Sequence, residues 1–206
     1  MQHMLPKSEI TKAKILVAAE AEFSEKGFFG ARVDEIAVAA GVNKRMIYQH
    51  YESKDGLYQA ALLSVYGKLA ECEARFCVDN LDPALAIKNI VYTYFRFLEE
   101  TPSFVRMLMW ENLNYGRSIS SEQVRLLKAP TINYIKEQIR RGMEQSLFRL
   151  DVDEYQVIVS IMNFGFSYFS NIHTLSALFG KDMTDSAEIL KRAEYVSNLI
   201  LNDLIK

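Results

Sequence analysis

Apolar residues recur at helical spacing along nearly the whole chain. One example is the set Ile15, Leu16, Ala19 and Phe23, which gives a first helix one apolar face. No strand-like alternation broken by turn pairs such as Asn-Gly occurs, and Gly and Pro are few, 9 and 4 of 206 residues. The pattern therefore predicts an all-α protein of about nine helices, near residues 8–26, 33–41, 43–51, 54–77, 83–100, 102–112, 121–142, 153–180 and 185–206.

Local signals mark where several of these helices begin and end. Ser8 or Thr11 can cap the first helix, and Gly27 ends it. Asp-Pro at 82–83 and Thr-Pro at 101–102 each read as a helix start. Pro130 is expected to kink or break the seventh helix. Asp151 or Asp153 can cap a long eighth helix that ends at Gly180, and Thr184 or Asp185 can begin the last one.

Residues 33–54 contain two short helical runs joined by a tight turn. Ile36, Ala37 and Ala40 keep helical spacing until Gly41, which suits a left-handed helix end. Asn43 can then cap a second helix, whose inner face carries Ile47 and Tyr51. Two short helices joined at a Gly-containing turn are typical of a helix-turn-helix DNA-binding module.

The outer face of the second short helix carries side chains suited to reading DNA. Arg45 can pair with guanine and Gln49 with adenine, each through two hydrogen bonds. Tyr48 can offer its ring to a thymine methyl group, and Lys54 can hold a phosphate. The predicted DNA-contacting set is Arg32, Asn43, Lys44, Arg45, Met46, Tyr48, Gln49, His50 and Lys54.

Overall charge neither supports nor excludes this interpretation. The formal net charge is −2, and residues 1–60 hold eight cationic and eight acidic side chains. Between Asn43 and Lys54 there are three cations against one anion, so the prediction depends on where the charges lie. The opening MQHMLPKSEITK lacks the apolar stretch of a signal peptide, and we therefore expect a cytoplasmic protein.

About fifty contiguous residues resemble the N-terminal signature of the TetR (tetracycline-repressor-like) family. The match runs through Ile15-Leu16, Ala18-Ala19, Phe23, Gly27-Phe28, Val33, Ile36-Ala37, Ala40-Gly41-Val42, Tyr48, Tyr51, Ser53-Lys54 and Leu57. The resemblance implies an operator-binding domain at residues 1–54, with its core at 8–54. It also implies a fourth helix at 54–77 that links this domain to a larger helical effector-binding and dimerisation domain at 55–206. By position, Lys44, Tyr48, His50 and Lys54 are expected to meet phosphates or bases.

Two positions depart from the family pattern. Ala31-Arg32 stands where Thr or Ser is common, which removes a capping or phosphate-contacting hydroxyl. Arg45-Met46 replaces a small pair such as Gly-Thr. Both departures affect which operator sequence is read more than whether DNA is bound.

Residues 155–180 contain no Asp, Glu, Lys or Arg. A membrane span is disfavoured, because small polar residues recur every three or four positions and no basic flank orients the segment. A helix buried on both sides, within its own domain and against a symmetric copy, fits better. We therefore expect a homodimer whose interface includes Ser160, Ser167, Asn171, Ile189, Ala193, Val196 and Ile200.

The central helices are rich in aromatic residues and Met, which favours a small-molecule pocket, although many of these side chains can equally be core. The segment SNIHTLSALFG also resembles a TetR subgroup that includes regulators of pyrimidine and nicotinate breakdown, which points to a small aromatic or heterocyclic effector. The predicted effector set is Phe95, Arg96, Met107, Trp110, Asn112, Tyr115, Tyr134, Asn163, Phe164, Tyr168, Asn171 and His173.

Nothing in the sequence predicts catalysis, a metal site or a cofactor. No nucleophile–base pair or Gly-rich phosphate loop occurs. Cys72 and Cys77 are interpreted as reduced thiols, because a zinc site needs further ligands and the three histidines lie far from them in the sequence. The sequence thus predicts a ligand-responsive repressor that binds a palindromic operator as a homodimer. The alternative is a helical ligand-binding protein or enzyme without DNA contact.

Overall fold

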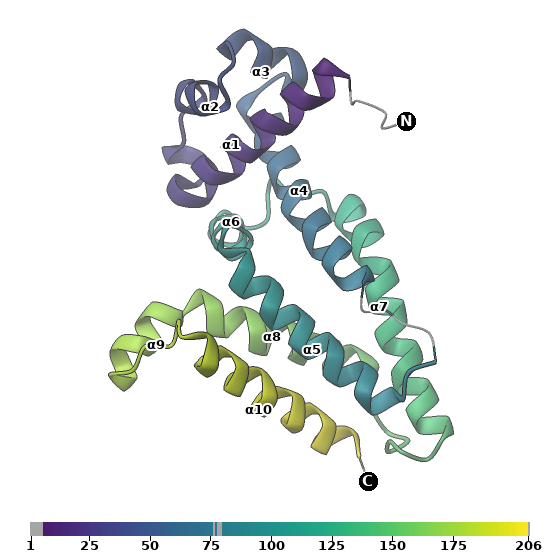
Figure 1. Ribbon diagram of the computed structural model, residues 1–206. Helices are drawn as coiled ribbons and strands as arrows, with labels where there is room; N and C mark the ends of the chain where they lie inside the picture. Colours follow the sequence, from purple (N-terminus) through teal and green to yellow (C-terminus); the bar gives the residue numbers. More distant parts are fainter. Residues whose placement is uncertain (1–5, 76, 78–79, 206) are drawn as a thin grey trace. The chain divides into compact units, whose positions relative to one another are not determined.

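A computed structural model describes residues 6–75, 77 and 80–205 of the chain. Figure 1 shows that this part is built from helices. Apart from an isolated antiparallel bridge between Phe148 and Ile205, the described residues form no β-structure, so the all-α prediction is confirmed. The helices are α1 (Lys7–Gly30), α2 (Val33–Ala40), α3 (Lys44–Tyr51), α4 (Lys54–Ala74), α5 (Pro83–Glu100), α6 (Pro102–Leu113), α7 (Ser121–Glu144), α8 (Glu154–Ser170), α9 (Ile172–Phe179) and α10 (Ser186–Leu204).

The chain divides into two compact units. The first unit runs to Lys68 and includes Ser103–Val124, so it contains α1 to α3, most of α4, and α6. The second unit comprises Leu69–Pro102 and residues from Arg125 onward. No described helix is both long enough and apolar enough to cross a membrane.

The core of the first unit is built on aromatic rings from α1 and α4. Phe23 and Tyr58 are completely buried, and their rings meet edge to face with centroids 4.9 Å apart. Ile15, Ile36 and Ile47 add fully buried side chains from α1, α2 and α3. Each helix therefore contributes the apolar stripe that its sequence spacing predicts.

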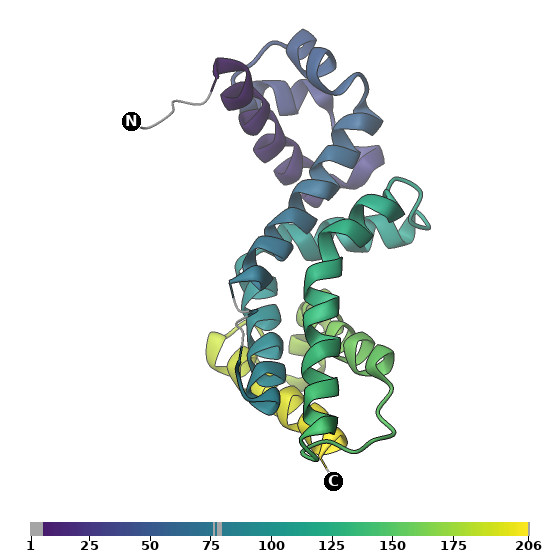
Figure 2. The same cartoon turned by 90° about the vertical axis from the view of Figure 1, so that its right-hand side faces the viewer.

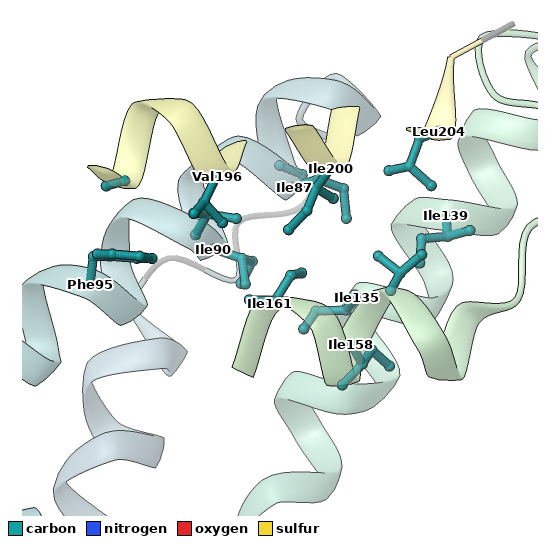
Figure 3. Close-up of a cluster of buried hydrophobic side chains, with 14 of the residues drawn as sticks. Ile87, Ile90, Phe95, Ile135, Ile139, Ile158, Ile161, Val196, Ile200 and Leu204 are labelled. Atoms are coloured by element: carbon teal, nitrogen blue, oxygen red, sulfur yellow. The ribbon is translucent and has the colours of Figure 1, made fainter. Parts of the chain in front are cut away.

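The core of the second unit lies between α5, α7, α8 and α10. Figure 3 shows the side chains of these helices pointing toward one another, and all of them are buried or nearly so. Figures 1 and 2 both show α10 lying alongside α5. The labelled side chains are Ile87, Ile90, Phe95, Ile135, Ile139, Ile158, Ile161, Val196, Ile200 and Leu204.

Several predicted helix ends are confirmed by capping geometry. The side chains of Asp82, Asp153 and Asp185 accept hydrogen bonds from the first turns of α5, α8 and α10. Gly180 is left-handed and ends α9. Gly27 has non-helical angles (φ 67°, ψ 178°) that interrupt α1 where its end was predicted, with the next three residues assigned to the same helix.

Other boundaries differ from the prediction. Helix α1 begins at Lys7, ahead of both predicted caps, and the carbonyl of Pro6 accepts from the N–H groups of Glu9 and Ile10. Of the kink or break predicted at Pro130, the break does not occur, because α7 runs through this residue as one helix. The predicted eighth helix is two helices, separated at Asn171 (φ −112°, ψ 10°), which raises the number of described helices to ten. Helix α4 ends at Ala74, before the predicted end at residue 77, and Phe76 lies outside the described residues.

Candidate DNA-binding interface

The turn between α2 and α3 has the predicted geometry. Gly41 is left-handed (φ 64°, ψ 36°), which removes the steric penalty that a side chain would meet there. The N–H of Val42 donates to the carbonyl of Ala37 at 3.0 Å. The side-chain oxygen of Asn43 accepts from the N–H of Arg45 at 2.8 Å and caps α3. These bonds satisfy backbone groups that the two helix ends would otherwise leave unpaired.

The inner face of α3 is fixed by Ile47 and Tyr51, both buried as predicted. The Tyr51 hydroxyl donates to the backbone carbonyl of Lys12 in α1 at 3.1 Å. Burial, assisted by the negative charge of Glu9, raises the pKa of Tyr51 to about 12. Tyr51 is therefore a core residue that joins α3 to α1.

The opposite face of α3 presents four exposed side chains, Lys44, Arg45, Tyr48 and Gln49. Tyr48 retains 40% of its surface, in contrast to 7% for Tyr51 on the inner side. The other two predicted contact residues on this helix, Met46 and His50, are half-buried. The structure thus brings a cation, a guanidinium group, an amide and a phenol onto one exposed face, and these groups suit base edges and phosphates.

Lys44 has an acidic partner that the sequence analysis did not anticipate. Its ammonium group lies 2.8 Å from a carboxylate oxygen of Asp34 in α2 and hydrogen bonds to the other at 2.9 Å. This hydrogen bond raises the pKa of Lys44. Both side chains are well exposed, so solvent screens the pair and it can exchange for a phosphate contact.

Lys54 begins α4 beside the aromatic cluster of the first unit. Its ammonium group lies 4.9 Å from the ring centre of Phe28, within the range of a cation–π contact. The hydroxyl of Ser53 accepts from the N–H of Gly56 at 3.0 Å. A side chain at Gly56 would have its Cβ 2.3 Å from the carbonyl oxygen of Tyr51, so only glycine allows α4 to start this close to the end of α3.

Arg32 precedes α2 without contributing a side-chain cap. The carboxylate of Glu22 in α1 instead accepts from the Arg32 N–H at 3.1 Å. The Arg32 side chain is exposed.

Glu20 and Trp110 tie α1 to α4 and α6 within the first unit, a feature that the sequence analysis missed. The buried Glu20 carboxylate accepts from Lys68 at 2.5 Å and from the Ser103 hydroxyl at 2.6 Å. The Trp110 indole N–H donates to the carbonyl of Ser24 at 3.3 Å. The Trp110 ring lies so close to Gly27 that an added Cβ would be 2.7 Å from it. The available signal was a pair of acidic residues, Glu20 and Glu22, between the apolar residues of α1.

The residues predicted to bind an effector are divided between the two units. Four of them belong to the first unit, where Met107 is buried, Trp110 packs on α1, and Asn112 and Tyr115 are exposed. The other eight belong to the second unit but do not converge on one pocket. They are Phe95, Arg96, Tyr134, Asn163, Phe164, Tyr168, Asn171 and His173.

Two open hollows on the second unit account for five of these eight residues. Phe95 and Arg96 border a hollow of about 460 Å³ between α5 and α10. Phe164, Tyr168 and Asn171 border a second, of about 440 Å³, where α8 and α9 meet α10. Tyr134 is a core residue, and Asn163 and His173 are exposed.

The predicted dimer residues fall into two groups that differ in how far their side chains are buried. On α8, Ser160 is half-buried and Ser167 is exposed, and Asn171 just beyond is also exposed. The α10 set is different, because its side chains lie in the core of the second unit against α5 and α8. That part of the prediction is corrected, since a fully packed side chain cannot also face a partner subunit. The α10 residues concerned are Ile189, Ala193, Val196 and Ile200.

Cys72 and Cys77 are both free and half-buried, and burial raises the pKa of each thiol. Among the described residues, no group of three or more His, Cys, Asp or Glu side chains could hold a metal ion.

A helix-turn-helix with an exposed polar recognition helix, joined to a larger helical unit, defines the class of helical transcription regulators. Residues 15–61 match the model described as bacterial regulatory proteins, tetR family, and residues 83–200 match the tetracyclin repressor-like C-terminal domain. The chain belongs to the TetR family of transcriptional regulators.

Two relatives match along nearly the full chain. The transcriptional repressor NicS of Pseudomonas putida is 31% identical over 195 residues, 94% of this chain and 92% of that protein. The transcriptional regulator RutR of Escherichia coli is 26% identical over 194 residues, 94% of this chain and 90% of that protein.

Solved structures share the fold at lower identity. PfmR, a TetR family regulator from Thermus thermophilus, has a TM-score of 0.73 at 22% identity, covering 95% of this chain and 97% of its own. The fatty acid degradation regulator FadR from Bacillus halodurans has a TM-score of 0.72 at 19% identity, with 97% of each chain covered.

Proposed function

We propose that this protein is a repressor that binds a palindromic operator as a homodimer and leaves it when a small molecule binds. The observation that carries the proposal is the exposed face of α3, which presents base-reading and phosphate-binding groups on a rigid, capped helix. Residues 1–54 form the DNA-binding domain in this proposal. Helix α4 links them to an effector-binding and dimerisation domain in residues 55–206.

The proposed contacts follow from exposure and chemistry. Arg45 and Gln49 read base edges through paired hydrogen bonds. Tyr48 contacts a thymine methyl group or a phosphate, and Lys54 fixes the register on the backbone. Lys44 contributes once a phosphate replaces Asp34 as its partner. Arg32, Asn43, Met46 and His50 complete the set, Asn43 chiefly through its cap on α3.

The proposed dimer surface is the outer side of α8 with the adjoining side of α10. Two hollows border this surface, one of about 430 Å³ that includes Ser160, Phe164 and Leu199, and the one of about 440 Å³ that includes Ser167 and Asn171. Uncharged small side chains on α8 allow two copies of the helix to approach closely. In a twofold dimer, the two recognition helices would meet half-sites about 34 Å apart on one DNA face.

Effector control requires that the ligand bind the DNA-free state more tightly than the DNA-bound state. Helix α4 is suited to carry this signal, since Lys54 begins it beside α3 and Glu73 lies near its other end. The relatives named as repressors support the direction of control.

The test is a binding titration with labelled DNA from the region upstream of the gene itself and of its neighbours, repeated over a range of salt. We expect specific binding that weakens steeply with salt, because each neutralised phosphate contributes about 0.9 to the slope of log K against log salt. Lys54→Ala should weaken all sequences about equally, and Gln49→Ala should relax the preference at one base pair.

Two outcomes would count against the proposal. Equal effects of the two substitutions on every sequence would contradict the division between phosphate and base contacts. Absence of salt-dependent binding to any of these DNAs would favour the alternative, a helical ligand-binding protein or enzyme that does not contact DNA.

A further inference from the structure

The second unit buries a charged cluster that the DNA-binding proposal does not use. Glu73 of α4, Lys128 of α7 and Thr131 of α7 are 6%, 8% and 4% exposed. The Lys128 ammonium group forms an ion pair with the Glu73 carboxylate, and the Thr131 hydroxyl donates to the same carboxylate at 2.7 Å. Both donors meet one oxygen atom, Oε2 of Glu73.

The surroundings of this cluster are apolar. A cavity of about 20 Å³ adjoins the three side chains and is bordered by Ile90, Tyr94, Ile135, Ile158, Ile161 and Met162, from α5, α7 and α8. That volume holds about one water molecule, so the cavity is nearly closed in this conformation. A ligand with an apolar body fits these walls once the cavity widens.

A buried ion pair is a poor source of stability, because removing two charges from water offsets most of their attraction. It is, however, sensitive to competition, since either partner can be replaced by another group of the same charge. Glu73, Lys128 and Thr131 therefore form a contact that a charged ligand can exchange.

The geometry shows which side chains form the binding site, Lys128 and Thr131, and which side chain fills it, Glu73. Lys128 and Thr131 are three residues apart on α7, so both side chains lie on one face of one helix and stay together. Glu73 belongs to a different helix, next to the exposed Ala74 at which α4 ends. Lys128 and Thr131 thus form a carboxylate-binding site, and in this structure the Glu73 carboxylate occupies it.

We propose that the effector is a small organic anion, a carboxylate on an apolar or aromatic body, that binds Lys128 and Thr131 in place of Glu73. Its arrival releases the end of α4 from α7, while its body fills the widened cavity between α5, α7 and α8. This inference rests on the proposed effector control and names the chemistry of the ligand.

An anion satisfies the site better than a cation. A cation paired with Glu73 would displace the Lys128 ammonium group and leave it facing isoleucine side chains without an acceptor. An anion displaces only the Glu73 carboxylate. This carboxylate can move into solvent, because the exposed end of α4 is one residue away.

The experiment measures binding of benzoate to the full chain by calorimetry, with benzamide as the uncharged control of nearly the same shape. Acetate serves as a smaller anion. The variants are Glu73→Gln, which removes the internal competitor, and Lys128→Met, which removes the charge of the binding site. Glu71→Gln is the matched control, because Glu71 lies on α4 two residues away and is exposed. Circular dichroism confirms that each variant is folded.

We expect benzoate to bind Glu73→Gln at least about tenfold more tightly than the wild type, since the displaced carboxylate no longer competes. Lys128→Met should lose benzoate binding, Glu71→Gln should match the wild type, and benzamide should bind none of them. A role of Glu73 in folding alone cannot produce tighter binding in Glu73→Gln.

Failure of both benzoate and acetate to bind folded Glu73→Gln would overturn the inference, because the binding site is then open. Equal binding of benzoate and benzamide would overturn it as well. Neither result affects the DNA-binding proposal, which the salt titration tests separately. Release of operator DNA by an uncharged effector would keep the proposed function and reject the anion site.

Discussion

At the scale of single residues, glycine has opposite consequences at two positions of the first unit. Gly41 is left-handed at the end of α2, whereas Gly67 lies inside α4, and a Cβ added at either would meet no atom within 4 Å. An alanine at either position therefore causes no steric clash, and the two substitutions differ only in the backbone conformation that alanine must adopt.

We predict that Gly41→Ala lowers the free energy of unfolding by about 1–2 kcal/mol, because a Cβ is disfavoured in the left-handed region. Gly67→Ala should raise it by about 0.5–1 kcal/mol, because alanine loses less conformational entropy in a helix. Urea unfolding of both variants checks the two signs. A stabilising Gly41→Ala would contradict the turn geometry.

Tyr51 gives the first unit a dependence on alkaline pH. Its folded pKa is raised from 10.0 to about 12, so the folded state holds the proton more tightly than the unfolded state. The associated stabilisation is fully present below pH 10 and is lost as the pH rises toward 12.

We predict that Tyr51→Phe costs about 1 kcal/mol at pH 8, where the hydrogen bond to Lys12 is lost, and less at pH 11. Unfolding of both proteins at the two pH values provides the measurement. Burial also raises the pKa values of Tyr58 and Tyr66. Both tyrosines are present in the two proteins, so their effect on the pH dependence of stability is the same in each. A cost independent of pH would reject the assignment to Tyr51.

Asp34 holds Lys44 in an ion pair, and in the proposed DNA complex it would compete with phosphates for that side chain. We predict that Asp34→Asn strengthens DNA binding at low salt and steepens the slope of log K against log salt by up to about 0.9, the value of one phosphate contact. Glu35→Gln is the matched control, since it removes a neighbouring acid that pairs with Lys26 instead. Equal changes in both variants would indicate a general charge effect rather than release of Lys44.

At the scale of helices, the sequence predicts an end well wherever a capping side chain or a left-handed glycine produces it. The ends at Asp82 and Gly180 follow the prediction for that reason, and Asp153 and Asp185 are each one of the two caps predicted for their helices. The break at Asn171 was not, because the segment holds no proline there and its apolar spacing continues on both sides.

Helical periodicity shows which positions share a face but not what covers that face. Ile189, Ala193, Val196 and Ile200 do share one, as predicted, yet α5 and α8 of the same chain cover it. Likewise, the outward face of α3 could be derived from its spacing, whereas the pairing of Lys44 with Asp34 could not. The Glu73–Lys128 pair joins residues 55 positions apart, which no local pattern reveals.

The contact of α8 with α5 depends on Gly165, where an added Cβ would lie 2.7 Å from the Tyr94 ring. We predict that Gly165→Ala lowers the free energy of unfolding by about 1–3 kcal/mol, because the two helices must move apart or the ring must shift. Ser167→Ala, on an exposed position two residues away, should change it by less than about 0.5 kcal/mol. Thermal unfolding distinguishes them, and equal effects would mean that α8 accommodates the methyl group.

At the scale of the whole molecule, the proposed binding to a palindromic operator requires that two copies of the chain pair. Leu199 is 42% exposed beside the proposed dimer surface, and Leu190 is 57% exposed on the side of α10 that borders α5. The two leucines therefore test which side of the helix faces the partner.

We predict that Leu199→Glu shifts the protein toward monomers and weakens binding to a palindromic site, while Leu190→Glu leaves both unchanged. The reason is that a charge buried at an interface without a partner is costly. Analytical ultracentrifugation and DNA titration measure the two effects. Dissociation by Leu190→Glu instead would place the interface on the α5 side.

Trp110 is the single tryptophan of the chain, and its indole ring lies against Gly27, where α1 is interrupted. Because indole emission responds to the polarity around the ring, this contact gives the first unit an intrinsic optical reporter. Any event that lifts α6 from α1 should shift the emission toward longer wavelengths, and one that preserves the contact should leave it unchanged. Unfolding or rearrangement of the first unit can therefore be followed in solution on the unmodified protein, with no dye attached to the recognition helix.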